Sequence, residues 1–130
     1  IVDRHRPVPV PGVSGVVSLG AGAWFHSMAV AGDGRSWAWG WNGFGQRGDG
    51  TTLERRRPVQ VAVTGLLAAA GGAFHSLGVD ASGAVRTWGW NGLGQLGDGT
   101  TVDRHLAVTV RLPAGVAVSV AAGAYHSVAG

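Results

Sequence analysis

The chain has 130 residues, of which 45% are hydrophobic and 13% charged, so its composition is that of a folded protein rather than a disordered one. The absence of cysteine excludes disulfides and thiolate metal sites, and no run of 18 uninterrupted apolar residues marks a membrane span. The net charge of +3 comes without a single lysine and without a dense basic stripe, which argues against nucleic acid as the partner.

Glycine is the clearest departure from average composition. The chain has 24 glycines where ordinary usage would give roughly 9. Glycine adopts positive φ without steric cost, so this excess without a collagen-like period favours an all-β fold with many tight turns.

The sequence repeats itself at a spacing of about 50 residues. The stretch W-G-W-N-G-F-G-Q-R-G-D-G-T-T at 39–52 returns as W-G-W-N-G-L-G-Q-L-G-D-G-T-T at 88–101. The dipeptide His-Ser begins at His26, His75 and His126. An acidic residue precedes Arg4, Arg55 and Arg104. These recurrences predict units of like structure, at approximately 1–52, 53–101 and 102–130.

Each unit reads as four short strands in chain order. In the first full unit we expect a strand at Val16–Leu19, a glycine-rich corner, and a second strand that starts at His26. Asp33-Gly34 then predicts a two-residue hairpin turn, and a third strand runs to Trp39. A long glycine-rich loop leads to a fourth strand at Pro58–Val61.

The later units give the same elements. We expect first strands at Leu66–Ala69 and Val116–Ala121, a turn at Ser82-Gly83, and a fourth strand at 107–110. In the second strand, Met28 and Val30 fall on one face, and small residues fall on the other. This alternation of large and small residues predicts a sheet that is buried on both faces.

The combined motif closely resembles the regulator-of-chromosome-condensation repeat in its bacterial form. It consists of G-x-x-H-S, an apolar strand, D-G, then W-G-x-N-x-x-G-Q-x-G-D-G-T-T and x-R-x-x-P-V, and it covers essentially the whole chain. Departures are an extra residue in the corner before His26, Ala107 in place of Pro, and Arg47 where the second copy has Leu96. The resemblance implies a β-propeller that normally closes with seven blades.

The expected fold is therefore all-β, with propeller blades of four antiparallel strands. About two and a half blades are present as a single partial propeller over 1–130, and we expect a fragment of a longer propeller rather than a chain whose ends pair with other copies. An open stack of blades leaves unpaired edges and uncovered faces, which a partner or further blades must cover.

Most polar residues that return in every unit are interpreted as structural. The three histidines recur at one strand position, so each is expected to bond a neighbouring loop rather than a metal or a substrate. Adjacent His and Ser side chains on a strand point to opposite faces and cannot share a proton directly. Asp49 and Asp98 are expected to cap turns, and the recurring arginines to form ion pairs or loop clamps. No catalytic, metal or cofactor site is predicted.

Aromatic side chains near the loop ends carry the main functional hypothesis. Exposed aromatics clustered at one rim are typical anchors for a protein partner. Packing between blades is the favoured interpretation of the recurring aromatics, and both interpretations stay open for Trp24 and Phe44. Trp24, Trp37 and Phe44 do not recur. Two arginines in a variable loop segment add to the set, although a solvated loop is the default for them. The candidate partner-binding residues are Trp24, Phe25, Trp41, Phe44, Phe74, Trp90, Tyr125, Arg56 and Arg57.

The predicted function is a protein-interaction module or scaffold that presents rim loops to a partner of unknown identity, and not an enzyme. Three alternatives stay open: a structural repeat element of a large secreted or surface protein, a secreted β-lactamase-inhibitor-like propeller, and a guanine-nucleotide exchange factor. Further blades of the same parent chain, or other copies, are additional candidate partners. An extracellular or cell-envelope location is favoured. Fold alone does not choose among these.

Overall fold

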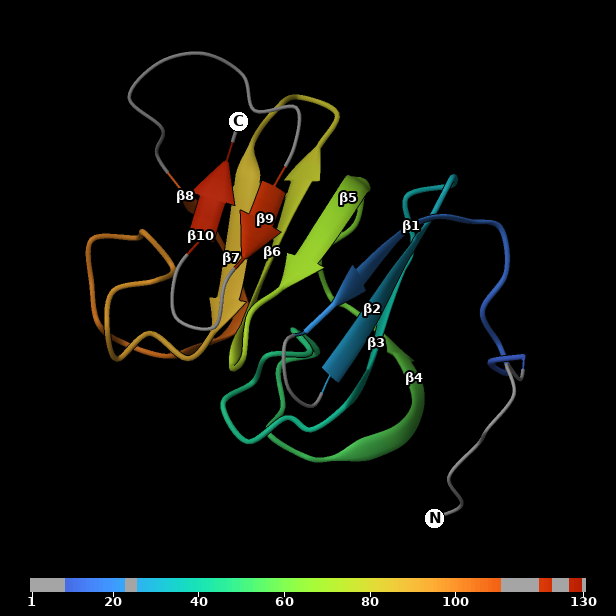
Figure 1. The fold of residues 1–130 in the computed structure, drawn as a ribbon, viewed down its shortest axis with the longest axis horizontal. Helices are drawn as coiled ribbons and strands as arrows, with labels where there is room; N and C mark the ends of the chain where they lie inside the picture. The colour runs from blue at the N-terminus through green and yellow to red at the C-terminus, as the bar shows by residue number, and fades with distance from the viewer. Residues whose placement is uncertain (1–8, 23–25, 111–119, 123–126, 130) are drawn as a thin grey trace.

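The computed structural model describes residues 9–22, 26–110, 120–122 and 127–129, and the described residues form strands, turns and loops without a helix. Two four-stranded sheets and one two-stranded sheet follow one another along the chain (Figure 1). The strands of the first sheet are β1 Val16–Ala21, β2 His26–Ala31, β3 Ser36–Gly40 and β4 Arg55–Gln60. Those of the second are β5 Leu66–Gly71, β6 His75–Asp80, β7 Val85–Gly89 and β8 Arg104–Val110. The third holds β9 Val120–Ala122 and β10 Ser127–Ala129.

Each full sheet is an antiparallel meander in chain order, β1-β2-β3-β4 and β5-β6-β7-β8. The register is the same in both, because His26 pairs with Gly40 in the first sheet and His75 pairs with Gly89 in the second. The predicted order of four antiparallel strands is confirmed in both full sheets. The fourth strands begin earlier than the Pro-Val segments indicated, at Arg55 and Arg104.

The hairpin turn between the second and third strands differs from the prediction. A two-residue turn of type I′ needs positive φ at both central residues. Here Gly34 has a φ of 85°, whereas Asp33 stays at negative φ and its carboxylate accepts a hydrogen bond from the Arg35 amide at 3.0 Å. The Gly34 amide donates to Ala31 O at 3.0 Å, which gives the longer turn with one left-handed glycine. The backbone from Asp80 to Ala84 repeats this turn, but there the capping carboxylate is that of Asp80, the first residue of the turn.

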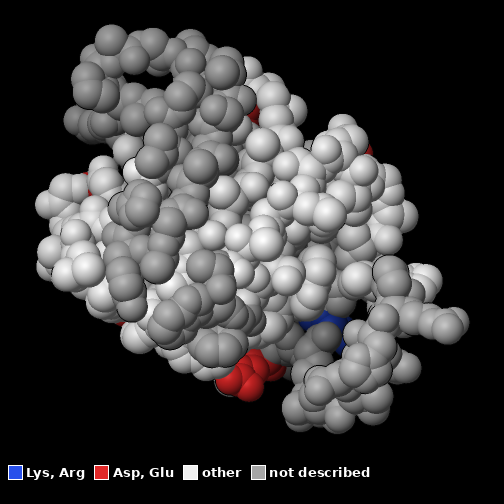
Figure 2. All heavy atoms as spheres, viewed as in Figure 1, with Lys and Arg blue, Asp and Glu red and all other residues white. Residues whose placement is uncertain are grey.

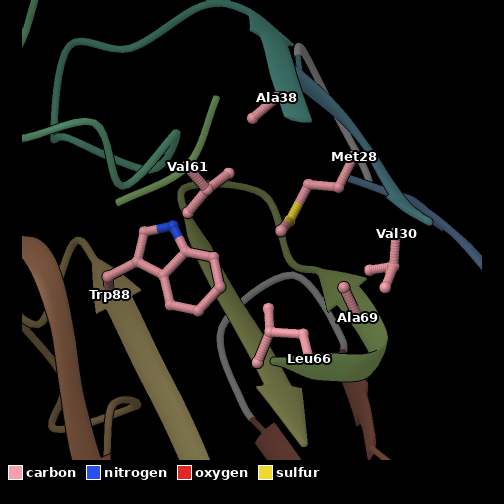
Figure 3. Close-up of a cluster of buried hydrophobic side chains, with 7 residues drawn as sticks. All are labelled: Met28, Val30, Ala38, Val61, Leu66, Ala69 and Trp88. Atoms are coloured by element: carbon pink, nitrogen blue, oxygen red, sulfur yellow. The ribbon is translucent and has the colours of Figure 1, made fainter. Parts of the chain in front are cut away.

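Successive sheets pack face to face through an apolar core (Figure 3). The first sheet and the segment after it contribute one half of the cluster, and the second sheet contributes the other. The buried cluster comprises Met28, Val30, Ala38, Val61, Leu66, Ala69 and Trp88. Burial of each large apolar side chain contributes about 2 kcal/mol. The opposite face of β2 is buried at Ala29, but Leu19, its neighbour on β1, is 74% exposed. In the second sheet Ser76 and Leu77, on opposite faces of β6, are both buried, so the prediction of a sheet buried on both faces is confirmed there.

The first strands of the blades approach one another closely. Strand β5 packs against β1 and β2, and β9 packs against β5 and β6. A Cβ on Gly20 would lie 2.8 Å from the backbone oxygen of Ala69, and one on Gly71 would lie 2.6 Å from the Cα of Gly22. Larger residues at Gly20 or Gly71 would push neighbouring blades apart, which explains why the corner segments are rich in glycine.

One buried asparagine organises each long loop, a role that the sequence interpretation missed. The side chain of Asn91 donates to the carbonyl oxygens of Thr100 at 2.9 Å and Val102 at 3.0 Å, and its Oδ1 accepts from the Leu96 amide at 3.0 Å. Asn42 makes the corresponding bonds in the first loop. The W-N dipeptide recurs in both units, so its recurrence already indicated a structural role for the asparagine.

We expect Asn91→Ala to lower the free energy of unfolding by about 2 kcal/mol, because it strands buried backbone groups of the loop. Urea denaturation measures the loss, and hydrogen exchange at the Leu96 amide reports whether the loop opens locally. Gln60→Ala, at an exposed position on β4, is the matched control and is expected to be neutral. Equal stability of Asn91→Ala and the parent chain would contradict this role.

Candidate functional site: an aromatic cluster at one rim

Four aromatic side chains from two blades form one cluster. Phe44 and Phe74 lie 5.6 Å apart between ring centroids, and Trp41 contacts both, at 5.4 and 5.5 Å, with its ring edge-on to theirs. Trp90 completes the group, 6.0 Å from each phenylalanine. These distances are in the range of favourable aromatic pairs. All four side chains keep part of their surface exposed, so the cluster both joins the blades and offers an apolar surface.

The register of the sheets places these rings at one rim. Trp41 follows the end of β3 and Trp90 the end of β7, whereas Phe74 precedes the start of β6. Because β6 and β7 are antiparallel, the start of one and the end of the other lie at the same edge, and the Trp90 amide donates to Phe74 O at 2.8 Å. Phe44 is held in its loop by a bond from its amide to Gln46 Oε1 at 3.0 Å.

The structure thus brings together four of the candidate residues from the sequence. Trp24, Phe25 and Tyr125 lie outside the described residues, as does the side chain of Arg56. Arg57 is exposed on β4. Leu93, the counterpart of Phe44 in the second unit, is also exposed.

Trp37, another aromatic that does not recur, is not part of this cluster. It is buried in β3, and the guanidinium of Arg35 lies 5.2 Å from its ring centroid. This side chain therefore packs within the blade rather than at the rim.

The recurring histidines join neighbouring blades. His26 Nε2 lies 2.9 Å from Ser76 Oγ, and His75 Nε2 lies 3.0 Å from Ser127 Oγ. Each serine in turn donates to a loop carbonyl, Ser76 to Gln46 O at 2.7 Å and Ser127 to Gln95 O at 2.9 Å. The structural interpretation holds for His26 and His75, but the partner of each is a strand serine of the next blade, and the loop carbonyl is reached only through it. His126 lies outside the described residues.

These bonds assign the proton on His26. A serine hydroxyl has one proton, and Ser76 gives it to Gln46 O, so His26 Nε2 carries the hydrogen that it donates to Ser76 Oγ. His26 Nδ1 is buried and has no hydrogen-bond partner among the described residues. Desolvation by burial, followed by repulsion from His75, lowers the pKa of His26 from 6.5 to about 4. His26 is therefore a neutral donor at pH 7.

This geometry tests whether the recurring His and Ser residues could act as a catalytic pair or as metal ligands. Within one dipeptide the two side chains point apart as predicted, and the His–Ser contact arises between blades instead. Ser76 is fully buried and its hydrogen is committed to a carbonyl, so it is not placed to attack a substrate. Within the ranges that the structure describes, no three His, Cys, Asp or Glu side chains gather as metal ligands would.

The turn-capping role of the two aspartates is confirmed. Asp98 Oδ1 accepts from the amide of Thr100 at 2.9 Å, and Asp49 does the same for Thr51. Burial alone would raise the pKa of Asp98, but bonds from Thr100, Arg104 and Asn91 lower it to about 2. Arg104 pairs with this carboxylate at 2.9 Å rather than with the adjacent Asp103, which accepts from the Asn91 amide instead.

In the first loop Arg47 stands at the position that Leu96 has in the second loop. Its counterpart Leu96 is buried, and Arg47 is equally enclosed, with an ion pair to Asp49 at 2.6 Å. The charged side chain thus takes the position of an apolar one because the turn-capping carboxylate lies beside it.

The visible surface is sparsely charged. Figure 2 shows mainly uncharged groups over the described part of this face, with acidic and basic groups at its margins. Among the described residues, no helix has the length and hydropathy that a membrane crossing requires.

Four-stranded antiparallel sheets that stack face to face, with their first strands adjacent, define the blades of a β-propeller. The chain belongs to the regulator of chromosome condensation (RCC1) repeat family, whose model matches residues 33–79 and 82–129. A second model of the same repeat matches residues 16–46 and 68–95. The family assignment from the sequence is confirmed; its bacterial qualifier, the repeat boundaries and the seven-blade closure stay predictions.

Curated relatives match over part of the chain. The ultraviolet-B receptor UVR8 of Arabidopsis thaliana is 49% identical over 45 residues, which are 35% of this chain and 10% of the receptor. The human E3 ubiquitin-protein ligase HERC2 is 40% identical over 62 residues, 46% of this chain and 1% of the ligase. The chain thus spans a tenth or less of these relatives.

Solved structures match over nearly the whole chain. Human WBSCR16 superposes with a TM-score of 0.82 at 26% identity, over 95% of this chain and 33% of that one. Prp20p of Saccharomyces cerevisiae gives 0.82 at 20% identity, over 94% and 32%. Yeast RCC1 (Prp20) in a structure with Kap60 gives 0.79 at 26% identity, over 92% and 29%. The chain therefore corresponds to about a third of each solved propeller chain.

Proposed function

We propose that the chain is a protein-binding module and that its rim cluster contacts the partner. The observation that carries this proposal is the joining of Trp41, Phe44, Phe74 and Trp90, all partly exposed, at one edge of two neighbouring blades. Large rings held by their neighbours lose little conformational entropy on binding, and such residues dominate protein interfaces. Yeast RCC1 (Prp20), a protein similar to this chain, has been solved with a protein, Kap60, bound to it.

A binding role fits the described residues better than a catalytic one. The recurring polar side chains form hydrogen bonds between blades, as His26 and Ser76 do, or cap turns, as Asp98 does. The cluster itself offers apolar surface without an ionisable group among its four members. The exchange-factor and β-lactamase-inhibitor alternatives are also binding roles and stay open. The extracellular or cell-envelope location stays a prediction.

Replacing Phe44 with alanine is expected to weaken partner binding about tenfold or more, which is the loss typical of an aromatic anchor. Peptides selected from a phage-displayed random library against the whole chain serve as probes, and fluorescence anisotropy measures their dissociation constants. Phe44→Leu, which installs the residue that the second unit has at Leu93, is the matched control and is expected to retain most of the affinity.

Circular dichroism and the unfolding midpoint of each variant verify that the blades remain folded. Binding that survives both Phe44→Ala and Trp90→Ala in folded protein would reject the rim cluster as the contact surface. Arg57→Ala, at an exposed site on β4, tests the basic contribution in the same assay.

A further inference from the structure

The fourth strand forms the outer edge of each full sheet. In the order β5-β6-β7-β8, strand β8 pairs with β7 along one side, and no described strand pairs with its other side. The blades stack through their sheet faces, as the second sheet does when β5 packs against β1 and β2. A further blade would therefore cover a face of the second sheet and leave the outer edge of β8 open.

The hydrogen bonds of the first sheet show which backbone groups of the fourth strand point outward. Val61 N donates to Ser36 O of β3 at 2.9 Å. Along an antiparallel strand the backbone groups of alternate residues point to opposite sides. Val59 therefore bonds β3 as well, whereas Pro58 and Gln60 turn their backbone groups to the outside of the sheet.

The fourth strand of the second sheet has the same register. Strand β8 pairs with β7 as β4 pairs with β3, and Val108 takes the place of Val59. The N–H and C=O groups of Ala107 and Thr109 therefore point outward. Within the part of the chain that the structure describes, no hydrogen bond joins these outward groups to another residue.

The two outer edges differ in how well they resist pairing with another strand. Pro58 has no N–H, and β4 carries three consecutive arginines at 55–57, so this edge lacks a donor and repels a like strand. In β8 the counterpart of Pro58 is Ala107, which keeps its N–H. Arg104 is the only arginine of β8, and its guanidinium pairs with Asp98 at 2.9 Å. The edge of β8 therefore has neither of the two features that protect β4.

The open edge of β8 is complementary to itself. When two copies run antiparallel with Ala107 opposite Thr109 of the second copy, each such pair exchanges both of its N–H···O bonds. The two-fold axis then passes beside Val108, and the paired residues are uncharged. This register leaves out His105, whose carbonyl already accepts from Gly50 N at 3.1 Å.

We propose that the outer edge of β8 binds a second copy of this chain, strand to strand, through the backbone groups of Ala107 and Thr109. The two β8 strands run antiparallel and join the second sheets of the two copies into one continuous sheet. A second copy is the occupant because an uncharged edge that pairs with itself needs no other sequence. The aromatic cluster is not part of this edge, so the inference does not depend on the proposed function.

The variant Ala107→Pro tests the backbone pairing. We expect the parent chain to sediment as a dimer whose fraction rises with concentration, and Ala107→Pro to sediment as a monomer because the outward N–H is lost. The first sheet accommodates proline at the matching place, Pro58, so the variant is expected to fold, which circular dichroism verifies. Ala107→Ser keeps the N–H and is the matched control that should remain dimeric. A monomeric parent chain, or a dimer that survives Ala107→Pro, would overturn the proposal.

A cross-linking measurement does not depend on the folding of the proline variant. The chain has no cysteine, and the proposed register brings Val108 of the two copies together as a non-hydrogen-bonded pair, whose Cβ atoms lie close. Val59, the counterpart of Val108 on β4, is also partly buried. With oxidised glutathione, we expect Val108→Cys to form about tenfold more disulfide-linked dimer than Val59→Cys. Equal amounts on a non-reducing gel, or no dimer from Val108→Cys, would reject the pairing of the β8 edges.

Discussion

Replacing Trp88 with alanine is expected to lower the free energy of unfolding by about 4 kcal/mol, the largest effect of any single substitution considered for this chain. The indole is fully buried in the core between the sheets, and its Nε1 donates to Gln46 O at 2.8 Å. The substitution therefore removes packing, opens a cavity and strands a loop carbonyl at once. Urea denaturation followed by circular dichroism measures the loss.

Trp39 provides a matched control for this prediction. It has the same residue type, the same place in the hairpin and the same pairing with a serine, but its face of the sheet is partly exposed. We expect Trp39→Ala to cost about 1 kcal/mol, since a partly exposed side chain loses less transfer free energy. Trp88→Phe keeps an aromatic ring and loses the donor, so its loss of unfolding free energy should lie between those of Trp39→Ala and Trp88→Ala. Similar losses for Trp39→Ala and Trp88→Ala would contradict the assignment of the core to the interface between the sheets.

The recurrence of residues predicted the fold almost completely. Two copies of the motif that begins at Trp39 and Trp88, together with the His-Ser dipeptides, were enough to give the four strands of each full sheet and the burial of the second sheet on both faces. Such agreement is expected for a repeat, because residues that return in every unit are the ones that the common structure requires.

Contacts between blades were harder to infer. The partner of His26 is Ser76, and Ser76 in turn donates to the backbone carbonyl of Gln46. A carbonyl belongs to every residue, so no residue type signals it, and the contact depends on how the sheets are staggered in space. The rim cluster illustrates the same point, since the sequence placed its aromatics at loop ends but gave no distance between Phe44 and Phe74.

The turn after β2 was mispredicted for a local reason. Asp33-Gly34 matches a two-residue hairpin, but the carboxylate of Asp33 bonds the Arg35 amide and pairs with the Arg35 side chain at 2.8 Å. A capping side chain of this kind stabilises the longer turn, in which the glycine alone needs positive φ. Sequence pattern alone does not separate the two turns.

Acidification from pH 7 to pH 4 is expected to destabilise the chain through its buried histidine. Desolvation, and then repulsion from His75, lowers the pKa of His26 from 6.5 to about 4. The unfolded chain binds a proton near pH 6.5, whereas folded His26 does so only near pH 4. The free energy of unfolding therefore keeps its full value above pH 6.5 and decreases as the pH falls from 6.5 to 4. The loss from His26 alone amounts to about 2 kcal/mol at pH 5 and about 3 kcal/mol near pH 4. Asp98, with a pKa of about 2, loses its contribution only at lower pH.

Urea denaturation at pH 7.5 and pH 5 measures this dependence, and the His26→Gln variant separates its source. Glutamine can still donate to Ser76 Oγ but does not titrate, so the variant is expected to lose some stability at pH 7.5 and to depend less on pH than the parent chain. NMR titration of the His26 imidazole should give a midpoint near 4. A midpoint near 6.5, or equal stability of the parent chain at the two pH values, would show that His26 is not the buried neutral donor that its contact with Ser76 requires.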